Sequence, residues 1–208
     1  MDQRAQRETD LVAYYDNEVR DRLDRSLPAQ RVAQRVVYLE LLEREGIHSI
    51  LEIGSGPGRD GEAFVAAGLA YTGVDLAPAS VAACRSRGLD AQVASVLDLP
   101  FDDCSFEAGW TMSTLLHIAD EDLDAALAEI VRVLRPDSPL AIGLWGDQTG
   151  GERLWRDGTD FGPPRFFSIR TDEALLDALR RHGTVEQWLT WQGNDSMHYQ
   201  WAVLRTPA

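Results

Sequence analysis

The sequence contains no lysine, because all 20 of its basic residues are arginines. This absence excludes pyridoxal-phosphate chemistry and any mechanism that uses a lysine nucleophile. Cysteine is scarce too: Cys84 lies in an expected helix and Cys104 in an expected turn. Since the two fit neither a metal-ligand spacing nor a secreted disulfide framework, we expect both thiols to be reduced.

Long apolar runs are also missing. No segment approaches the ~18 uninterrupted apolar residues of a membrane-spanning helix, and residues 1–8 are too polar for a signal peptide. We therefore expect a cytoplasmic protein without a membrane partner. With 208 residues, of which 44% are hydrophobic, the chain has the size and composition of one globular domain.

An excess of positive charge is absent as well, since the formal net charge is -14. Residues 1–44 hold eight arginines and nine acidic residues, whereas residues 45–208 hold twelve arginines and 25 acidic residues. Nucleic-acid-binding proteins normally present a basic face that neutralises phosphates. The composition therefore argues against DNA or RNA as a partner unless the arginines of residues 1–44 act alone. A monomer and a homodimer are both open.

The most informative motif is a glycine-rich turn, since residues 50–58 read Ile-Leu-Glu-Ile-Gly-Ser-Gly-Pro-Gly. Gly54, Gly56 and Gly58 alternate directly after an apolar strand and before an expected helix. Glycines at such a place allow a sharp turn and a close approach of the backbone to a ligand. A second expected strand ends at Asp75, whose carboxylate can accept hydrogen bonds from both hydroxyls of a ribose. Together these features predict a nucleotide-like ligand.

The same glycines admit a second register, because Gly56, Gly58 and Gly61 also fit the G-x-G-x-x-G pattern of dinucleotide dehydrogenases. We favour the first register because the strand of residues 50–53 ends directly before Gly54. A nicotinamide-dependent oxidoreductase is therefore the alternative function. Against it, the chain shows no second substrate domain, and without lysine it contains no Tyr-x-x-x-Lys pair.

Five segments together resemble the S-adenosylmethionine-dependent class I methyltransferases, in particular the small single-domain, type 11-like members. They are the glycine motif at 52–58, the acidic strand end at 73–76, the segment Ser-Val-Leu-Asp-Leu-Pro-Phe at 95–101, the strand and turn at 106–118, and the helix end at 130–136. The resemblance covers roughly residues 30–145, and the order and spacing of the segments are typical of the family. One departure is Asp137-Ser138, where the family usually carries two glycines.

The resemblance implies a Rossmann-like α/β fold with a mostly parallel seven-stranded sheet, and the alternation of expected strands and helices agrees with it. Apolar residues at helical spacing predict two N-terminal helices, the first containing Val12, Tyr15, Val19 and Leu23 and the second containing Val32, Val36 and Leu39. The expected strands are 48–53, 71–75, 91–96, 106–112, 140–145, 184–191 and 198–204, and the other expected helices are 59–67, 78–86, 120–134 and 172–182. The last two strands lie too close in sequence for a parallel crossover, so they must form an antiparallel hairpin.

We therefore expect a single methyltransferase domain over residues 1–208. Its expected parts are an N-terminal helical cap at 1–45, a cofactor-binding core at 46–145, a lid at 146–170, and a C-terminal helix and hairpin at 171–208.

The resemblance also implies S-adenosylmethionine as the cofactor, bound beyond the carboxyl ends of the central strands. The glycine turn would pass under the methionine part, Asp75 would hold the ribose, and Asp98 would accept from the adenine amino group unless it is only a solvated turn residue. Leu76 and Leu99 would pack on the adenine ring, and Thr111 and Met112 would border the sulfonium. The residues assigned to the cofactor are Glu52, Gly54, Ser55, Gly56, Gly58, Asp75, Leu76, Asp98, Leu99, Thr111 and Met112.

Methyl transfer requires mainly positioning, because the sulfonium is already activated, and it needs a general base only when the acceptor arrives protonated. His117 and Asp147, which follow the fourth and fifth expected strands, are the candidate catalytic residues. The alternatives are a packed histidine and an ordinary loop aspartate. Catechol-type methyltransferases bind magnesium through acidic residues at these two places; here Thr111-Met-Ser replaces the first, so we expect no metal.

Residues 146–170 form a long connection that is rich in glycine and aromatic residues, as is typical of a lid or binding loop. We expect its aromatic side chains to close an acceptor pocket together with the first helix; alternatively, they only cap the edge of the sheet. The predicted substrate-pocket residues are Tyr14, Tyr15, Trp145, Trp155 and Phe166. The expected acceptor is a small molecule or a peptide terminus methylated on oxygen or nitrogen, and a non-catalytic cofactor-binding module is a third possible function.

Overall fold

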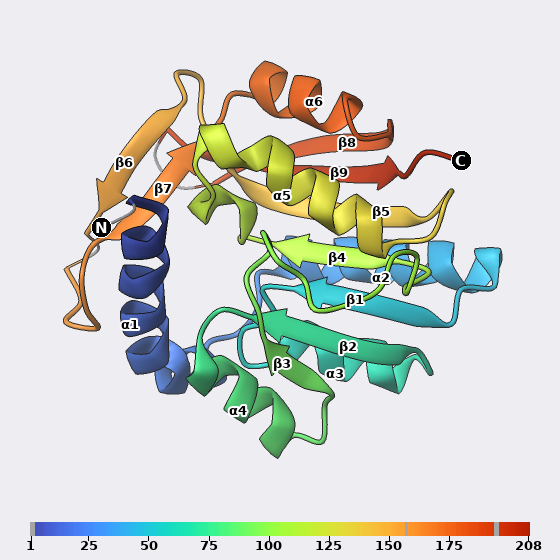
Figure 1. Ribbon diagram of the computed structural model, residues 1–208, viewed down its shortest axis with the longest axis horizontal. Coiled ribbons are helices and arrows are strands. Elements are labelled where there is room, and N and C mark those ends of the chain that lie inside the picture. Colours follow the sequence, from blue (N-terminus) through green and yellow to red (C-terminus); the bar gives the residue numbers. More distant parts are fainter. Residues whose placement is uncertain (1–2, 157, 194–195) are drawn as a thin grey trace.

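The computed structural model describes residues 3–156, 158–193 and 196–208. Its centre is a seven-stranded sheet with the strand order β3-β2-β1-β4-β5-β9-β8 (Figure 1). Strands β1 to β5 pair in parallel, whereas β9 pairs antiparallel with both β5 and β8. The strands are β1 (Ser49–Ile53), β2 (Ala70–Asp75), β3 (Ala91–Val93), β4 (Gly109–Met112), β5 (Pro139–Gly146), β8 (Thr184–Gln192) and β9 (His198–Arg205). The predicted sheet, including its terminal hairpin, is confirmed.

Helices cover both faces of this sheet, and each face has its own buried cluster. The helices are α1 (Gln3–Asp24), α2 (Ala29–Glu45), α3 (Arg59–Ala66), α4 (Pro78–Ser86), the 3-10 helix η1 (Leu115–His117), α5 (Asp120–Val133) and α6 (Asp172–Arg180). Apolar side chains of α2, α3 and α4 pack together on one face, and those of α5 and α6 pack on the other. A parallel sheet covered on both sides needs strands that are apolar throughout, and Ile50, Leu51 and Ile53 of β1 are all buried.

Local signals explain where several helices begin and end. Gly46 ends α2 in the left-handed conformation, with φ of +67°, which glycine adopts without steric cost. Thr171 begins α6 by accepting a hydrogen bond from the backbone N–H of Ala174. Pro78 occupies the first position of α4, where a missing N–H is harmless.

The parallel strands β1, β2 and β4 end at the same edge of the sheet, and α1 crosses in front of that edge (Figure 1). Strands β2 and β4 lie on opposite sides of β1, so the strand order changes direction there. Ligands of open α/β sheets bind at such a switch point, beyond the strand ends. Within the described residues, no helix combines the length and apolar character that crossing a membrane requires.

The structure differs from the sequence prediction in three places. The buried residues of α1 are Leu11, Tyr14 and Glu18, one position off the predicted apolar stripe. Val36 of α2 is 48% exposed, because that helix buries Tyr38, Leu41 and Leu42 instead. The predicted lid is not irregular, since β6 (Gly151–Trp155) and β7 (Arg165–Ile169) pair as an antiparallel two-stranded sheet.

Candidate functional site

The glycine turn after β1 has all three glycines in the left-handed region, with φ of +76° at Gly54, +52° at Gly56 and +83° at Gly58. The three positions exclude a side chain for different reasons. A β-carbon at Gly54 would lie 1.8 Å from Oγ1 of Thr114, and one at Gly58 would lie 2.5 Å from a methyl group of Leu89. At Gly56 the nearest atom would be Cζ of Arg22, at 3.9 Å. At Gly56 a β-carbon would therefore make only an ordinary van der Waals contact, and it is the positive φ that favours glycine there.

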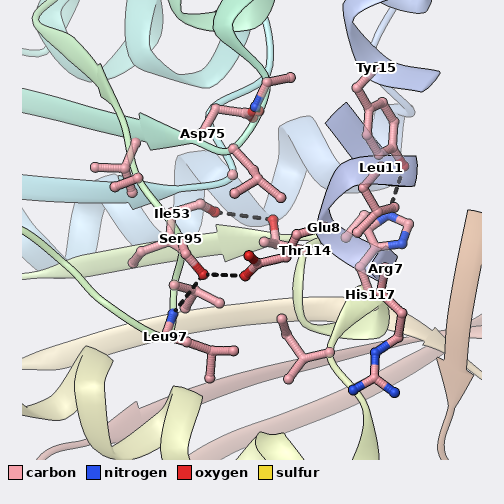
Figure 2. A pocket seen from close by; sticks show the side chains of 18 of the residues that line it. Arg7, Glu8, Leu11, Tyr15, Ile53, Asp75, Ser95, Leu97, Thr114 and His117 are labelled. Carbon is pink, nitrogen blue, oxygen red and sulfur yellow. Dashed lines mark hydrogen bonds between the residues drawn. The ribbon is translucent and has the colours of Figure 1, made fainter. Parts of the chain in front are cut away.

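Asp75, at the end of β2, is fixed by this turn. Its carboxylate accepts hydrogen bonds from the backbone N–H of Gly56 at 2.8 Å and from that of Ala77 at 2.9 Å. Burial raises the pKa of Asp75, while the two N–H donors oppose that shift. The carboxylate lies on the wall of a cavity (Figure 2). It is therefore oriented before any ligand arrives, and each oxygen retains a lone pair for a further donor.

The cavity lies between the strand ends and α1 and encloses about 100 Å³. The sheet side contributes the strand ends and turns at residues 53–54, 74–77, 94–97, 112–114 and 117–119, together with Asp122. The opposite wall is one face of α1, formed by Arg4, Arg7, Glu8, Leu11, Tyr15 and Arg22. These six residues recur at helical spacing, so α1 turns a mainly polar face toward the cavity.

Helix α1 is held across the cavity by bonds at both ends of the opening. Asp16 accepts a hydrogen bond from the backbone N–H of Ala79 in α4, at 2.8 Å. On the other side, Nη2 of Arg7 lies 3.1 Å from a carboxylate oxygen of Asp122 in α5. Between them, the hydroxyl of Tyr15 lies 2.7 Å from Nε2 of His117. The helix thus closes a site that the strand ends would otherwise leave open.

His117 lines the cavity, but both nitrogens of its ring have partners. Nδ1 lies 2.9 Å from the carbonyl oxygen of Phe166, which can only accept, so Nδ1 carries the proton. Nε2 therefore accepts from the Tyr15 hydroxyl. Burial lowers the pKa of His117 to about 3, and the positive charges of Arg165 and Arg22 act in the same direction. At neutral pH the ring is neutral and joins α1 to β7, which favours the structural alternative over a general base.

This depressed pKa predicts a pH-dependent stability. The unfolded chain protonates the histidine near pH 6.5, whereas the folded chain keeps it neutral down to about pH 3. The free energy of unfolding should therefore fall as pH drops from 6.5 toward 3, by up to about 1.4 kcal/mol per pH unit from this group. Urea unfolding at pH 7 and pH 5.5 should show a smaller difference for His117→Gln than for the parent chain. His48→Gln, at an exposed position, is the control, and an unchanged slope in His117→Gln would contradict the assignment.

Asp147, the second catalytic candidate, lies outside the cavity lining. Its Oδ1 accepts from the backbone N–H of Thr149 at 2.9 Å and of Gly150 at 2.6 Å, and its Oδ2 lies 3.0 Å from Nη2 of Arg153. The pKa of Asp147 is lowered to about 2, because these donors outweigh the effect of burial. The carboxylate therefore stabilises the turn before β6, and we do not propose it as a base.

The predicted cofactor residues divide into two groups. Gly54, Asp75, Leu76 and Met112 line the cavity, whereas seven others do not: Glu52, Ser55, Gly56, Gly58, Asp98, Leu99 and Thr111. Leu99 belongs to the core under α5, and Asp98 is exposed. The chain instead presents Ser95, Val96 and Leu97 to the cavity.

Of the five predicted substrate-pocket residues, only Tyr15 lines the cavity. The other four do not line it. Tyr14 contacts Phe161 edge to face, Trp155 lies against Phe167, Arg7 stacks on Phe166, and Trp145 packs on Tyr199. The contacts of Phe161 and Phe166 place the β6–β7 hairpin against α1, whereas Trp155 packs within the hairpin and Trp145 within the central sheet.

The sequence prediction missed the polar face of α1 and the wall residues Ser113 and Thr114. It identified the segment 95–101 but assigned Asp98 and Leu99 to the ligand, whereas Ser95, Val96 and Leu97 line the cavity. The α1 residues of the cavity wall recur at helical spacing, but an apolar stripe does not indicate a polar face. Ser113, with φ of +56°, is a strained residue at the end of β4, and no sequence pattern indicated it. In the part of the chain that the structure describes, no three His, Cys, Asp or Glu side chains are grouped as a metal site.

Comparisons with known proteins agree with this geometry. A family model described as "Methyltransferase domain" matches residues 50–137. O-methyltransferase cnsE from Penicillium expansum is 35% identical over 119 residues, which is 52% of this chain and 41% of that protein. O-methyltransferase resE from Aspergillus sclerotiorum is 32% identical over 117 residues, 52% of this chain and 43% of that protein. The chain thus spans about two fifths of the length of these curated relatives.

A solved structure extends the likeness to nearly the whole chain. The 1,6-didemethyltoxoflavin-N1-methyltransferase of Burkholderia thailandensis, with bound 1,6-didemethyltoxoflavin and S-adenosylhomocysteine, superimposes with a TM-score of 0.73. It is 22% identical, and the match covers 97% of this chain and 87% of that one. At this identity the likeness supports the fold.

Proposed function

Given that the chain belongs to the S-adenosylmethionine-dependent class I methyltransferases, we propose that it transfers a methyl group from S-adenosylmethionine to a hydroxyl oxygen of a small molecule. The preference for oxygen rests on the relatives, several of which are O-methyltransferases. The observation that carries the proposal is the half-buried Asp75 carboxylate, held by two backbone N–H groups beside Gly54 at the switch point of the sheet.

The residues around the cavity fit such a cofactor. Asp75 would accept from the ribose hydroxyls, and the apolar side chains of Leu76 and Leu97 would contact the adenine ring. The methionine part would lie along the glycine turn beside Gly54, where the guanidinium of Arg22 could bind its carboxylate. When bound, the cofactor supplies an activated methyl group. The chain's own residues then have to orient the two reactants and exclude water.

The state of His117 narrows the class of acceptor. Its ring is neutral, and both ring nitrogens are engaged by Phe166 and Tyr15. A hydroxyl that ionises on its own does not need this histidine as a base. We therefore propose a phenol or an enol as the acceptor. The rate of methyl transfer should rise with pH as a larger fraction of the acceptor ionises.

The closed position of α1 implies that the helix moves during loading. A cavity of about 100 Å³ is smaller than the ~300–1,000 Å³ of typical small-molecule sites. The sheet side of the site is built from the core of the fold, whereas α1 meets it across the cavity through side-chain contacts, among them those of Asp16, Arg7 and Tyr15. We propose that α1 shifts outward to admit the cofactor and then closes over it.

The test has two stages. Calorimetric titration of the full chain with S-adenosylhomocysteine and with NAD should show saturable binding of the first alone. Binding of NAD alone would instead support the oxidoreductase alternative. Incubation with methyl-labelled S-adenosylmethionine and a panel of phenols and enols should then transfer label to oxygen. If the cofactor product binds but no acceptor in this and a parallel amine panel is labelled, the non-catalytic module becomes the better explanation.

A further inference from the structure

Glu8 places a carboxylate inside the cavity from the α1 side. Figure 2 shows this side chain pointing away from the helix and toward Ser95, on the opposite wall. Its Oε1 accepts a hydrogen bond from the Ser95 hydroxyl at 2.8 Å. That hydroxyl in turn accepts from the backbone N–H of Leu97 at 3.3 Å. The bond thus connects the helix to the turn that follows β3.

The position of Ser95 relates Glu8 to the base of a nucleoside. Val93 of β3 is in register with Asp75, and the backbone N–H of Ala94 donates to the carbonyl of Asp75. The chain then continues along the cavity wall through Ser95. A ligand whose ribose is held by Asp75 and whose base lies over the end of β3 would therefore present an edge of that base to Ser95 and Glu8.

No other acidic side chain is as well placed at this part of the wall, among the residues that the structure describes. Asp98, in the same turn, is exposed and does not line the cavity. Asp122 lines the cavity but is ion-paired with Arg7. The same pairing directs the Arg7 guanidinium toward Asp122 and Glu121 and away from Glu8.

We propose that Glu8 accepts a hydrogen bond from the 6-amino group of the cofactor's adenine and so makes selection of the base depend on α1. The inference rests on the proposed placement of the cofactor. An ionised carboxylate only accepts hydrogen bonds, so it fits an amino group and repels a carbonyl oxygen at the same position. The residue is a specificity determinant and takes no part in the transfer of the methyl group.

The test compares two ligands by calorimetry on the full chain. One is S-adenosylhomocysteine, and the other is its hypoxanthine analogue, in which a carbonyl oxygen replaces the 6-amino group. The parent chain should prefer the adenine compound by about 10- to 100-fold, as expected for a hydrogen bond to a charged acceptor. Glu8→Gln should remove or reverse the preference, because its amide can also donate to the carbonyl. Asp10→Asn, on the same helix but outside the cavity, should keep the parent ratio.

The possible outcomes separate the two proposals. If the parent chain binds neither compound, the placement of the cofactor fails and the role of Glu8 fails with it. Tight binding of S-adenosylhomocysteine together with a parent-like ratio in Glu8→Gln would overturn the role of Glu8 alone. If Asp98→Asn lost the preference for the adenine compound and Glu8→Gln kept it, Asp98 and not Glu8 would be the residue that binds the 6-amino group. Melting temperatures within about 3 °C of the parent would show that the variants are folded.

Discussion

Replacing Asp75 by alanine should weaken binding of S-adenosylhomocysteine at least tenfold and should destabilise the fold at the same time. The binding loss follows from two ribose hydrogen bonds, each worth about 0.5–1.5 kcal/mol or more with a charged acceptor. The stability loss follows from the structure, because the carboxylate is the acceptor for the backbone N–H groups of Gly56 and Ala77. A buried donor that loses its acceptor costs about 1–3 kcal/mol.

A second variant separates the two effects. Asp75→Asn keeps one oxygen for the backbone donors, so it should lose less stability than Asp75→Ala while still binding the ligand less tightly than the parent. Asp98→Ala, in the exposed turn outside the cavity, is the control and should change neither quantity. Calorimetry measures the affinity for S-adenosylhomocysteine, and urea unfolding measures the free energy of unfolding. Parent-like affinity in a folded Asp75→Ala protein would rule out the ribose contact.

Replacing Asp60 by alanine should cause a large loss of stability. This residue is 1% exposed and lies in the first turn of α3. Its carboxylate accepts from Nε of Arg31 at 2.9 Å, from Nη1 of Arg35 at 2.6 Å and from Nε1 of Trp110 at 3.1 Å. Asp60→Ala would leave two arginines of α2 in a largely buried place without their counter-charge. Removing one partner of a buried ion pair costs about 3–5 kcal/mol, and we expect a loss of that size in the free energy of unfolding.

An exposed aspartate provides the matched control. On α6, Oδ1 of Asp177 lies 3.4 Å from Nη1 of Arg180, and each side chain is 61% exposed. Asp177→Ala should change the free energy of unfolding by no more than about 0.5 kcal/mol. If Asp60→Ala also lost less than about 1 kcal/mol in urea unfolding, the arginines would have to reach water when the carboxylate is removed.

The sequence was sufficient to predict the sheet, the glycine turn and the strand end at Asp75. Each of these depends on local backbone needs or on a period of buried apolar residues, and both are visible in a single chain. Asp98 shows where this reasoning stops. It lies in an irregular turn between β3 and β4, and no periodicity fixes which side chains of such a turn face the ligand. Ser95 and Leu97 line the cavity instead.

Helix α1 shows a second limit of prediction from the sequence. Hydrophobic periodicity reports which face of a helix meets an apolar core, and the cavity face of α1 is largely polar, with Arg4, Arg7 and Glu8 on it. The same difficulty affects the β6–β7 hairpin. The order of its aromatic residues in sequence does not show that Phe167 packs between Trp155 and His117.

The attachment of α1 also has a kinetic consequence. Exchange of spent for fresh cofactor would require the contacts of Arg7, Glu8, Asp16 and Tyr15 to open together, since all four lie on one helix. Cooperative opening of this kind is slow, and in many enzymes such a step limits turnover. Dissociation of S-adenosylhomocysteine, followed by stopped flow, should accelerate as added salt weakens the pairing of Arg7 with Asp122 and Glu121. The residence time of the spent cofactor would then depend on the ionic strength of the solution.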